Sequence, residues 1–238
     1  MTYLEFHLVF LLPPLLWLAL GGVPKGSRAP GYLLMPLIAL LWTTPWDNYL
    51  VYRGVWTYPP ERVWFRIGYV PFEEYLFFVL QPLLTGLVAH RLFQPGPGGP
   101  AWARSLGGMG FLLLSLLGGL LVQNEKGVYL GLILLWFGPP LALQWAFGGD
   151  LLLGALKPYL LSVLLPTLYL WCADLLAIRM GIWAISERYT LGIAPFGLPL
   201  EEMVFFLVVN LAIVQGLFLV WHPEARRRLQ RLQGGKPS

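Results

Sequence analysis

Apolar residues run in long stretches along this chain, and most polar residues lie in the intervals between them. A helix needs roughly 20 predominantly apolar residues to cross the hydrocarbon core of a bilayer, with a range of about 17 to 25. Seven stretches meet this requirement, so the pattern predicts seven transmembrane helices. We place them at residues 4–20, 32–52, 72–92, 106–123, 128–147, 153–178 and 198–221.

The composition supports this reading. Of 238 residues, 57% are apolar and 12% are charged, and the mean hydropathy is +0.66. Such a chain has more apolar surface than one soluble core could bury, so we expect an all-α, multi-pass protein of the cell membrane. No basic segment precedes the first apolar run, and Glu5 lies inside it. We therefore expect no cleaved signal peptide and keep residue 1 in the mature chain.

Basic residues follow the last apolar stretch, at Arg226, Arg227, Arg228, Arg231 and Lys236. The positive-inside rule places this tail in the cytoplasm and, with seven crossings, the N-terminus outside. We expect a solvated tail that faces the membrane surface. Nucleic-acid binding is not expected, because no basic face is interleaved with aromatic residues.

An internal repeat divides the chain. Residues 3–14 (YLEFHLVFLLPP) align without a gap with residues 129–140 (YLGLILLWFGPP), at an offset of 126. Asp47, Gly54 and Trp56 recur at an offset of 127, and the segment from Pro71 to Phe78 recurs at 128. The repeat predicts a three-helix unit at 1–92 and a second at 128–221. Residues 93–127 would be a linker with a fourth helix, which makes the two units parallel, and residues 222–238 a basic tail.

Each unit carries paired carboxylates, in PFEEYLFF and PLEEMVFF, directly after a proline. Acids in the first turn could simply cap a helix, because the helix dipole favours a negative charge there. Capping does not require two acids and two phenylalanines in both halves, and ionisable residues in membrane segments are commonly functional. Adjacent helical residues point about 100° apart, so one acid of each pair can face a given target. The candidate catalytic residues are Glu73, Glu74, Glu201 and Glu202, with Phe77, Phe78, Phe205 and Phe206 as pocket residues.

Two aspartates and two tryptophans complete the candidate site. Asp47 and Asp174 end equivalent helices, and each is followed nine residues later by a tryptophan, Trp56 or Trp183. We interpret the aspartates as orienting or cation-stabilising groups and the two tryptophans as pocket walls. Most of the remaining aromatic residues between these helices and the Glu pairs, Tyr58 among them, we interpret as anchors at the membrane interface.

The duplicated pattern of Asp, Gly-x-Trp and Pro-x-Glu-Glu followed by aromatic residues resembles the membrane lycopene cyclases built from two three-helix units. In that family the units are separate subunits or are fused in one chain. The resemblance covers roughly residues 1–92 and 128–221. It implies a lycopene β-cyclase, an isomerase of carotenoid biosynthesis that acts on lycopene and other linear carotenoids. It also implies the four glutamates as acidic site residues and possible association with other carotenoid enzymes.

No cofactor or metal is expected. The three histidines and the single cysteine form no ligand cluster, and no G-x-G-x-x-G motif follows a predicted strand. The strongest rival function is a small transporter or channel, since such proteins also have repeats and membrane acids. A UbiA-like prenyltransferase, which the lack of Asp-x-x-x-Asp spacing weakens, a noncatalytic scaffold and an opsin are further candidates. An opsin would need a lysine deep in a helix, and no lysine lies there.

Overall fold

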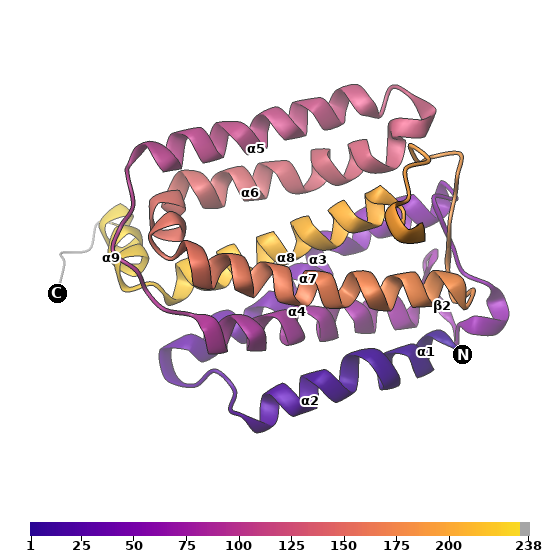
Figure 1. Cartoon of the computed structure of the whole chain (residues 1–238), viewed down its shortest axis with the longest axis horizontal. Coiled ribbons are helices and arrows are strands. Elements are labelled where there is room, and N and C mark those ends of the chain that lie inside the picture. The colour runs from indigo at the N-terminus through magenta and orange to yellow at the C-terminus, as the bar shows by residue number, and fades with distance from the viewer. Residues whose placement is uncertain (234–238) are drawn as a thin grey trace.

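The computed structural model describes residues 1–233, which form long helices packed side by side (Figure 1). The first apolar stretch is one continuous helix in three parts, α1 (Tyr3–Phe6), a π-helical segment (His7–Leu11) and α2 (Leu12–Leu20). The other helices are α3 (Ala29–Tyr52), α4 (Phe72–Leu92), α5 (Trp102–Leu121), α6 (Val128–Gly154), α7 (Leu156–Arg179), α8 (Leu200–Trp221) and α9 (Pro223–Leu232). Short strands are β1 (Trp56–Thr57), β2 (Arg66–Ile67), β3 (Val70–Pro71) and β4 (Ala184–Ile185).

The prediction of an all-α membrane protein is confirmed, but the number of candidate spans differs. Within residues 1–233, six helices are long and apolar enough to cross a membrane, and α3 is not among them. Helix α3 has 24 residues, yet polar residues such as Thr43 and Asp47 interrupt its apolar sequence. Both of these side chains are buried inside the bundle. The sequence therefore predicts the position of α3 correctly. The helix has a less apolar composition because some of its polar side chains point into the bundle.

Helices α4 and α8 form the centre of the bundle. Helix α4 packs against α3, α7 and α8, and α8 packs against α6, α7 and α3. Helix α3, the second helix of the first predicted unit, thus contacts α8 of the other unit as well as α4 of its own. Helix α7, the second helix of the other unit, likewise contacts both α4 and α8. Helix α5 packs along α6, where an added Cβ at Gly118 would lie 2.6 Å from the carbonyl oxygen of Gly131. Only glycine allows the two backbones to approach so closely.

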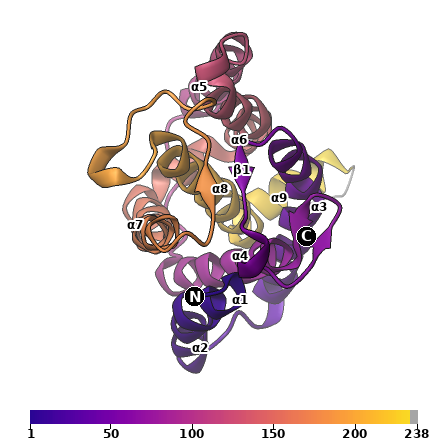
Figure 2. The ribbon, with the colours of Figure 1, turned by 90° about the vertical axis from the view of Figure 1, so that its right-hand side faces the viewer.

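The central helices begin in the same way. Pro71 and Pro199 are the residues immediately before α4 and α8, with φ of −57° and −54°. Each is followed by two glutamates in the first helical turn. The loops that lead to these prolines meet above the bundle, because β1 and β4 pair antiparallel, with Trp56 opposite Ile185. Figure 2 shows β1 near the middle of the bundle when it is viewed from the end that carries the N-terminus.

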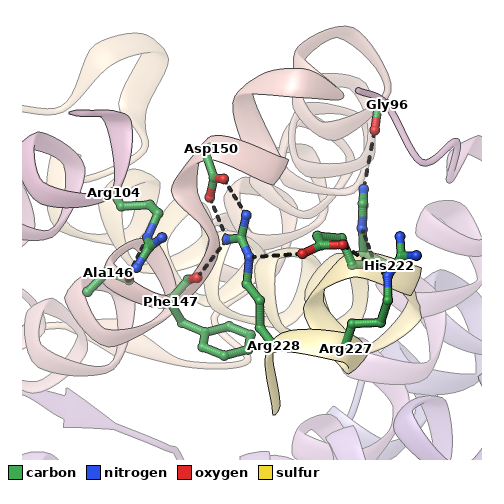
Figure 3. A network of polar contacts seen from close by, with 9 residues as sticks. Gly96, Arg104, Ala146, Phe147, Asp150, His222, Arg227 and Arg228 are labelled. Atoms are coloured by element: carbon green, nitrogen blue, oxygen red, sulfur yellow. Dashed lines mark hydrogen bonds and ion pairs between the residues drawn. The ribbon is translucent and has the colours of Figure 1, made fainter. Parts of the chain in front are cut away.

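The opposite end carries α9, which an ion pair fixes to the bundle (Figure 3). Arg228 donates two hydrogen bonds to the carboxylate of Asp150, at 2.8 and 2.5 Å. Arg226 donates to the carbonyl oxygens of Val220 and Ser27. Carbonyl and carboxylate oxygens at the helix ends thus bind these two arginines. Lys236 lies outside the described residues.

Candidate active site

A small cavity of about 20 Å³ lies at the end of the bundle that carries the N-terminus, below the paired strands β1 and β4. Both predicted units contribute to its wall. The lining residues include three of the predicted acids and five of the predicted aromatic residues. They are Tyr3, Trp56, Tyr58, Glu74, Phe77, Asp174, Trp183, Ile185, Glu202, Phe205 and Phe206. None of these lining residues carries a positive charge.

Glu74 is held by two phenols. Its Oε2 atom accepts hydrogen bonds from the hydroxyl groups of Tyr3, at 2.6 Å, and Tyr58, at 2.9 Å. Tyr3 comes from the first helix and Tyr58 from the loop after β1, so α4 and two distant segments place these three oxygens together. Burial and the neighbouring Glu74 carboxyl hold the pKa of Tyr58 well above its usual range. Tyr58 therefore remains protonated and able to donate.

Glu202 has an equivalent but different set of donors. Its Oε1 atom accepts from the hydroxyl group of Tyr129 at 2.6 Å and from the indole nitrogen of Trp56 at 3.1 Å. Tyr129 lies in the same predicted unit as Glu202 and corresponds to Tyr3, whereas Trp56 belongs to the other unit. The position that corresponds to Tyr58 is Ile185, which has no hydroxyl group. The two carboxyls are therefore similar in place and unequal in surroundings.

The first glutamate of each pair has another environment. Glu73 Oε1 accepts from the backbone N–H of Trp64 at 2.7 Å, and Glu201 Oε1 accepts from that of Leu191 at 2.8 Å. Neither residue lines the cavity. Each carboxylate thus connects the loop before its helix to the first helical turn.

The two predicted aspartates are both buried. Asp174 lines the cavity, and its Oδ1 accepts from the indole nitrogen of Trp183 at 2.8 Å. Asp47 does not line the cavity, and neither of its carboxyl oxygens has a hydrogen-bond partner. It is close enough to Glu74 and Glu202 to interact with both electrostatically. Four buried carboxyls therefore form one cluster, with exposed fractions of 0% for Asp47, 1% for Asp174, 3% for Glu202 and 5% for Glu74.

Aromatic rings surround this cluster. Trp183 packs against Tyr3 and Phe6 of the other predicted unit, with centroid distances of 4.8 and 5.1 Å. Phe77, Phe205 and Phe206 line the cavity as predicted, whereas Phe78 does not and instead contacts Tyr75. Among residues 1–233, no group of three or more His, Cys, Asp or Glu side chains is placed to hold a metal ion.

Sequence reasoning missed the phenols. Tyr3 and Tyr129 begin the two aligned segments, so the repeat itself marks them as equivalent. The interpretation of Tyr58 as an interface anchor is wrong, because the residue is 6% exposed and bonds to Glu74. By contrast, Trp64 and Tyr69 from the same loop are 71% and 53% exposed. No local signal separates Tyr58 from these neighbours, since only the folded loop turns it inward.

Known proteins share this chain's pattern over most of its length. A family model described as lycopene cyclase matches residues 1–92 and 126–219. A protein named lycopene beta-cyclase from Halobacterium salinarum is 41% identical over 236 residues, which cover 95% of this chain and 99% of that protein. A bifunctional lycopene cyclase/phytoene synthase from Sporisorium reilianum is 40% identical over 92% of this chain and 34% of its own length. A similar bifunctional protein from Phycomyces blakesleeanus is 35% identical over 90% of this chain and 38% of its own. No solved structure matches.

Proposed function

This chain belongs to the lycopene cyclase family, and on that premise we propose that it is an enzyme that closes β-rings at the linear ends of lycopene. The observation that carries the proposal is the cluster of buried carboxyls in an aromatic cavity without a positive charge. Ring closure changes no oxidation state. It requires a proton donor, a proton acceptor and a space from which water is excluded.

The proposed reaction balances within the site. A carboxylic acid gives its proton to the terminal double bond of the polyene, which forms a C–H bond and leaves a tertiary cation. The next double bond along the chain attacks this cation, and the new carbon–carbon bond closes the ring. A carboxylate then removes a proton from the ring carbon that has become bonded, and the electrons of that C–H bond form the ring double bond. One proton enters the substrate and one leaves it.

We assign the acid and the base to Glu74 and Glu202. Both line the cavity, whereas Glu73 and Glu201 bond to loop backbones outside it. An isolated charge in a dry interior costs several kcal/mol, so four close carboxyls without a cation cannot all be ionised. Such a cluster can hold one carboxyl neutral as a donor and another ionised as an acceptor, the arrangement used by other paired carboxyl sites. Asp174, beside Glu202 in the wall, belongs to the same proton-holding cluster.

The aromatic wall would protect the cation. Ring faces attract positive charge and offer no nucleophile that could trap it. Trp183 and Phe77 contribute to this wall together with Phe205 and Phe206. An apolar wall also excludes water, which would convert the cation to an alcohol.

The test is pigment analysis in a bacterium that accumulates lycopene. Expression of the wild-type protein should give products with cyclic ends, identified by retention time and absorption spectrum. Glu74→Gln and Glu202→Gln should each give unchanged lycopene at normal protein level. The matched controls, Glu73→Gln and Glu201→Gln, keep an oxygen that can accept the loop N–H and should still form rings. Ring formation by both cavity variants would refute the assignment.

We further propose that residues 1–92 and 128–221 are two copies of one unit joined by residues 93–127, with the basic segment 222–238 in the cytoplasm. The equivalent places of Tyr3 and Tyr129, and of Glu74 and Glu202, support the duplication. Helices α1 and α9 lie at opposite ends of the bundle, which supports an N-terminus outside (Figure 1). A reporter that is active only in the cytoplasm should be active when fused to the C-terminus and inactive at the N-terminus.

A further inference from the structure

Two apolar grooves open on the outside of the helix bundle, away from the carboxyl cluster. One lies between α2, α4 and α7 and has a volume of about 300 Å³. The other lies between α3, α6 and α8 and has a volume of about 170 Å³. We name them the α2–α4–α7 groove and the α3–α6–α8 groove. Their walls are almost wholly apolar, and exposed residues such as Leu165 in the first and Ile38 in the second face the lipid side.

The grooves occupy equivalent positions in the two units. Each is formed by the first and third helices of one unit and the middle helix of the other. With the offsets of the repeat, Pro14 corresponds to Pro140, Leu84 to Ala212 and Tyr169 to Trp42, and all six residues line their respective grooves. The duplication of the acids is thus matched by a duplication of the grooves on the same helices.

Each groove lies further along the helix that carries one of the cavity carboxyls. On α4, Leu84 follows Glu74 by ten residues, which is about 15 Å along the helix axis, and Ala212 follows Glu202 by the same spacing on α8. In each groove one wall residue also contacts the first helix of a unit. Tyr169 donates a hydrogen bond to the carbonyl oxygen of Phe10 at 2.6 Å, and the rings of Trp42 and Trp136 lie 5.1 Å apart. Phe10 and Trp136 are equivalent positions of the repeat.

The size of the cavity limits what it can hold. At about 20 Å³, it has room for roughly one water molecule. That is far less space than a forty-carbon polyene needs. Most of the substrate must therefore lie elsewhere against the protein or in the lipid around it.

We propose that the two grooves bind the polyene chain of the substrate while its end group lies at the carboxyl cluster. This inference rests on the proposed function. The α2–α4–α7 groove serves a chain whose end is beside Glu74, and the α3–α6–α8 groove serves one whose end is beside Glu202. Lycopene dissolves in lipid, so a groove that opens to the bilayer lets the chain enter sideways between helices.

The test fills the grooves. Val88→Trp in the α2–α4–α7 groove and Ala212→Trp in the α3–α6–α8 groove each enlarge a half-buried wall residue. Both substitutions fill space that the chain would occupy, so the double variant should have a kcat/KM for lycopene that is roughly tenfold or more below wild type. A short acyclic alkene with the same terminal pair of double bonds needs no groove and should be cyclised at the wild-type rate. Leu116→Trp is the matched control, because Leu116 lies on α5 outside both grooves and is 68% exposed.

A second measurement does not depend on turnover. In vesicles that contain the inactive Glu74→Gln protein, bound lycopene should shift the polyene absorption bands, and adding both tryptophan substitutions should remove the shift. If lipid alone fills the grooves, the double variant will cyclise lycopene as wild type does, which overturns the proposal. Equal loss with the short alkene also overturns it, because the damage then lies at the carboxyls. Failure of the wild-type protein to form rings would instead refute the proposed function.

Discussion

Replacing Tyr58 with phenylalanine removes one oxygen from the cavity and should slow ring closure while the protein remains folded. The lost hydroxyl group lies 2.9 Å from Glu74 Oε2, and Tyr3 remains as the second donor to the same oxygen at 2.6 Å. When Glu74 is the acid, its negative charge appears only as the substrate cation forms. Each phenol therefore stabilises the transition state through a hydrogen bond to an ion.

The size of the effect follows from that bond. A hydrogen bond to a charged group contributes about 1.5–3 kcal/mol, which corresponds to a rate lower by roughly tenfold to a hundredfold. The assay is the initial rate of ring formation by membranes with equal amounts of protein, measured by chromatography of the pigments. Tyr52→Phe is the matched control, because Tyr52 ends α3 just before the same loop and is 64% exposed. Full activity of Tyr58→Phe would refute the role of the phenol, and an equal loss in Tyr52→Phe would show a nonspecific effect.

The raised pKa of Tyr58 adds a statement about pH. Its causes are burial and the adjacent Glu74 carboxyl, and both favour the neutral phenol. The hydroxyl group therefore keeps its proton up to and beyond the usual tyrosine pKa of about 10. We therefore expect that ionisation of Tyr58 causes no loss of wild-type activity between about pH 8 and 10. Tyr58→Phe should have the same dependence of activity on pH in this range.

Three further substitutions test the assembly. Asp150→Asn weakens the ion pair with Arg228 by about 1.5–3 kcal/mol and should make α9 more susceptible to trypsin, as measured by limited proteolysis. Trp56→Phe removes an N–H donor from Glu202 and should lower the rate of ring formation by several-fold to roughly tenfold, with unchanged protein level. Gly154→Ala would place a Cβ in steric overlap with the carbonyl oxygen of Pro97 and should lower the melting temperature by several degrees, at a cost of about 1–3 kcal/mol.

Each of these has a control elsewhere in the chain. Arg227, whose side chain is 58% exposed, is the control for the ion pair, since Arg227→Gln should leave cleavage of α9 at other sites unchanged. Trp64→Phe, at a residue that is 71% exposed, should not alter the rate. Gly110→Ala meets nothing within 4 Å and should leave the melting temperature unchanged. If a control substitution has the same effect as the substitution it is paired with, the contact removed by the latter does not explain that effect.

The sequence predicts where the acids lie but not which of each pair faces the cavity. Adjacent residues in a helix point about 100° apart, so Glu73 and Glu74 must have different surroundings. Which one turns inward depends on the rotation of α4 and on the loop that supplies the N–H of Trp64. Both are tertiary features, and no pattern within PFEEYLFF contains them. The doubled motif is nevertheless sufficient to find the region, because polar residues are rare in these stretches.

The segments that sequence patterns predict least well are those without a long apolar run. Residues 53–71 form β1, a short 3₁₀ turn, β2 and β3, and they bury Tyr58 while exposing Trp64. Helix α9 has a polar sequence and depends on Asp150, more than 70 residues earlier, for its position. Helical periodicity reports which face of a helix is buried, but it does not identify distant partners such as Asp150 and Ser27.

Both halves of the chain contribute residues to the candidate site. Each unit supplies a tyrosine and a glutamate that bond to each other, yet Trp56 of the first unit bonds to Glu202 of the second, and Trp183 of the second packs against Tyr3 of the first. The second helix of each unit also contacts the other unit, since α3 contacts α8 and α7 contacts α4. One unit alone would therefore have a carboxyl with a phenol but without part of its aromatic wall. Because the exchange also forms both grooves, a change that separates the units should affect the carboxyl cluster and the chain-binding surfaces at once.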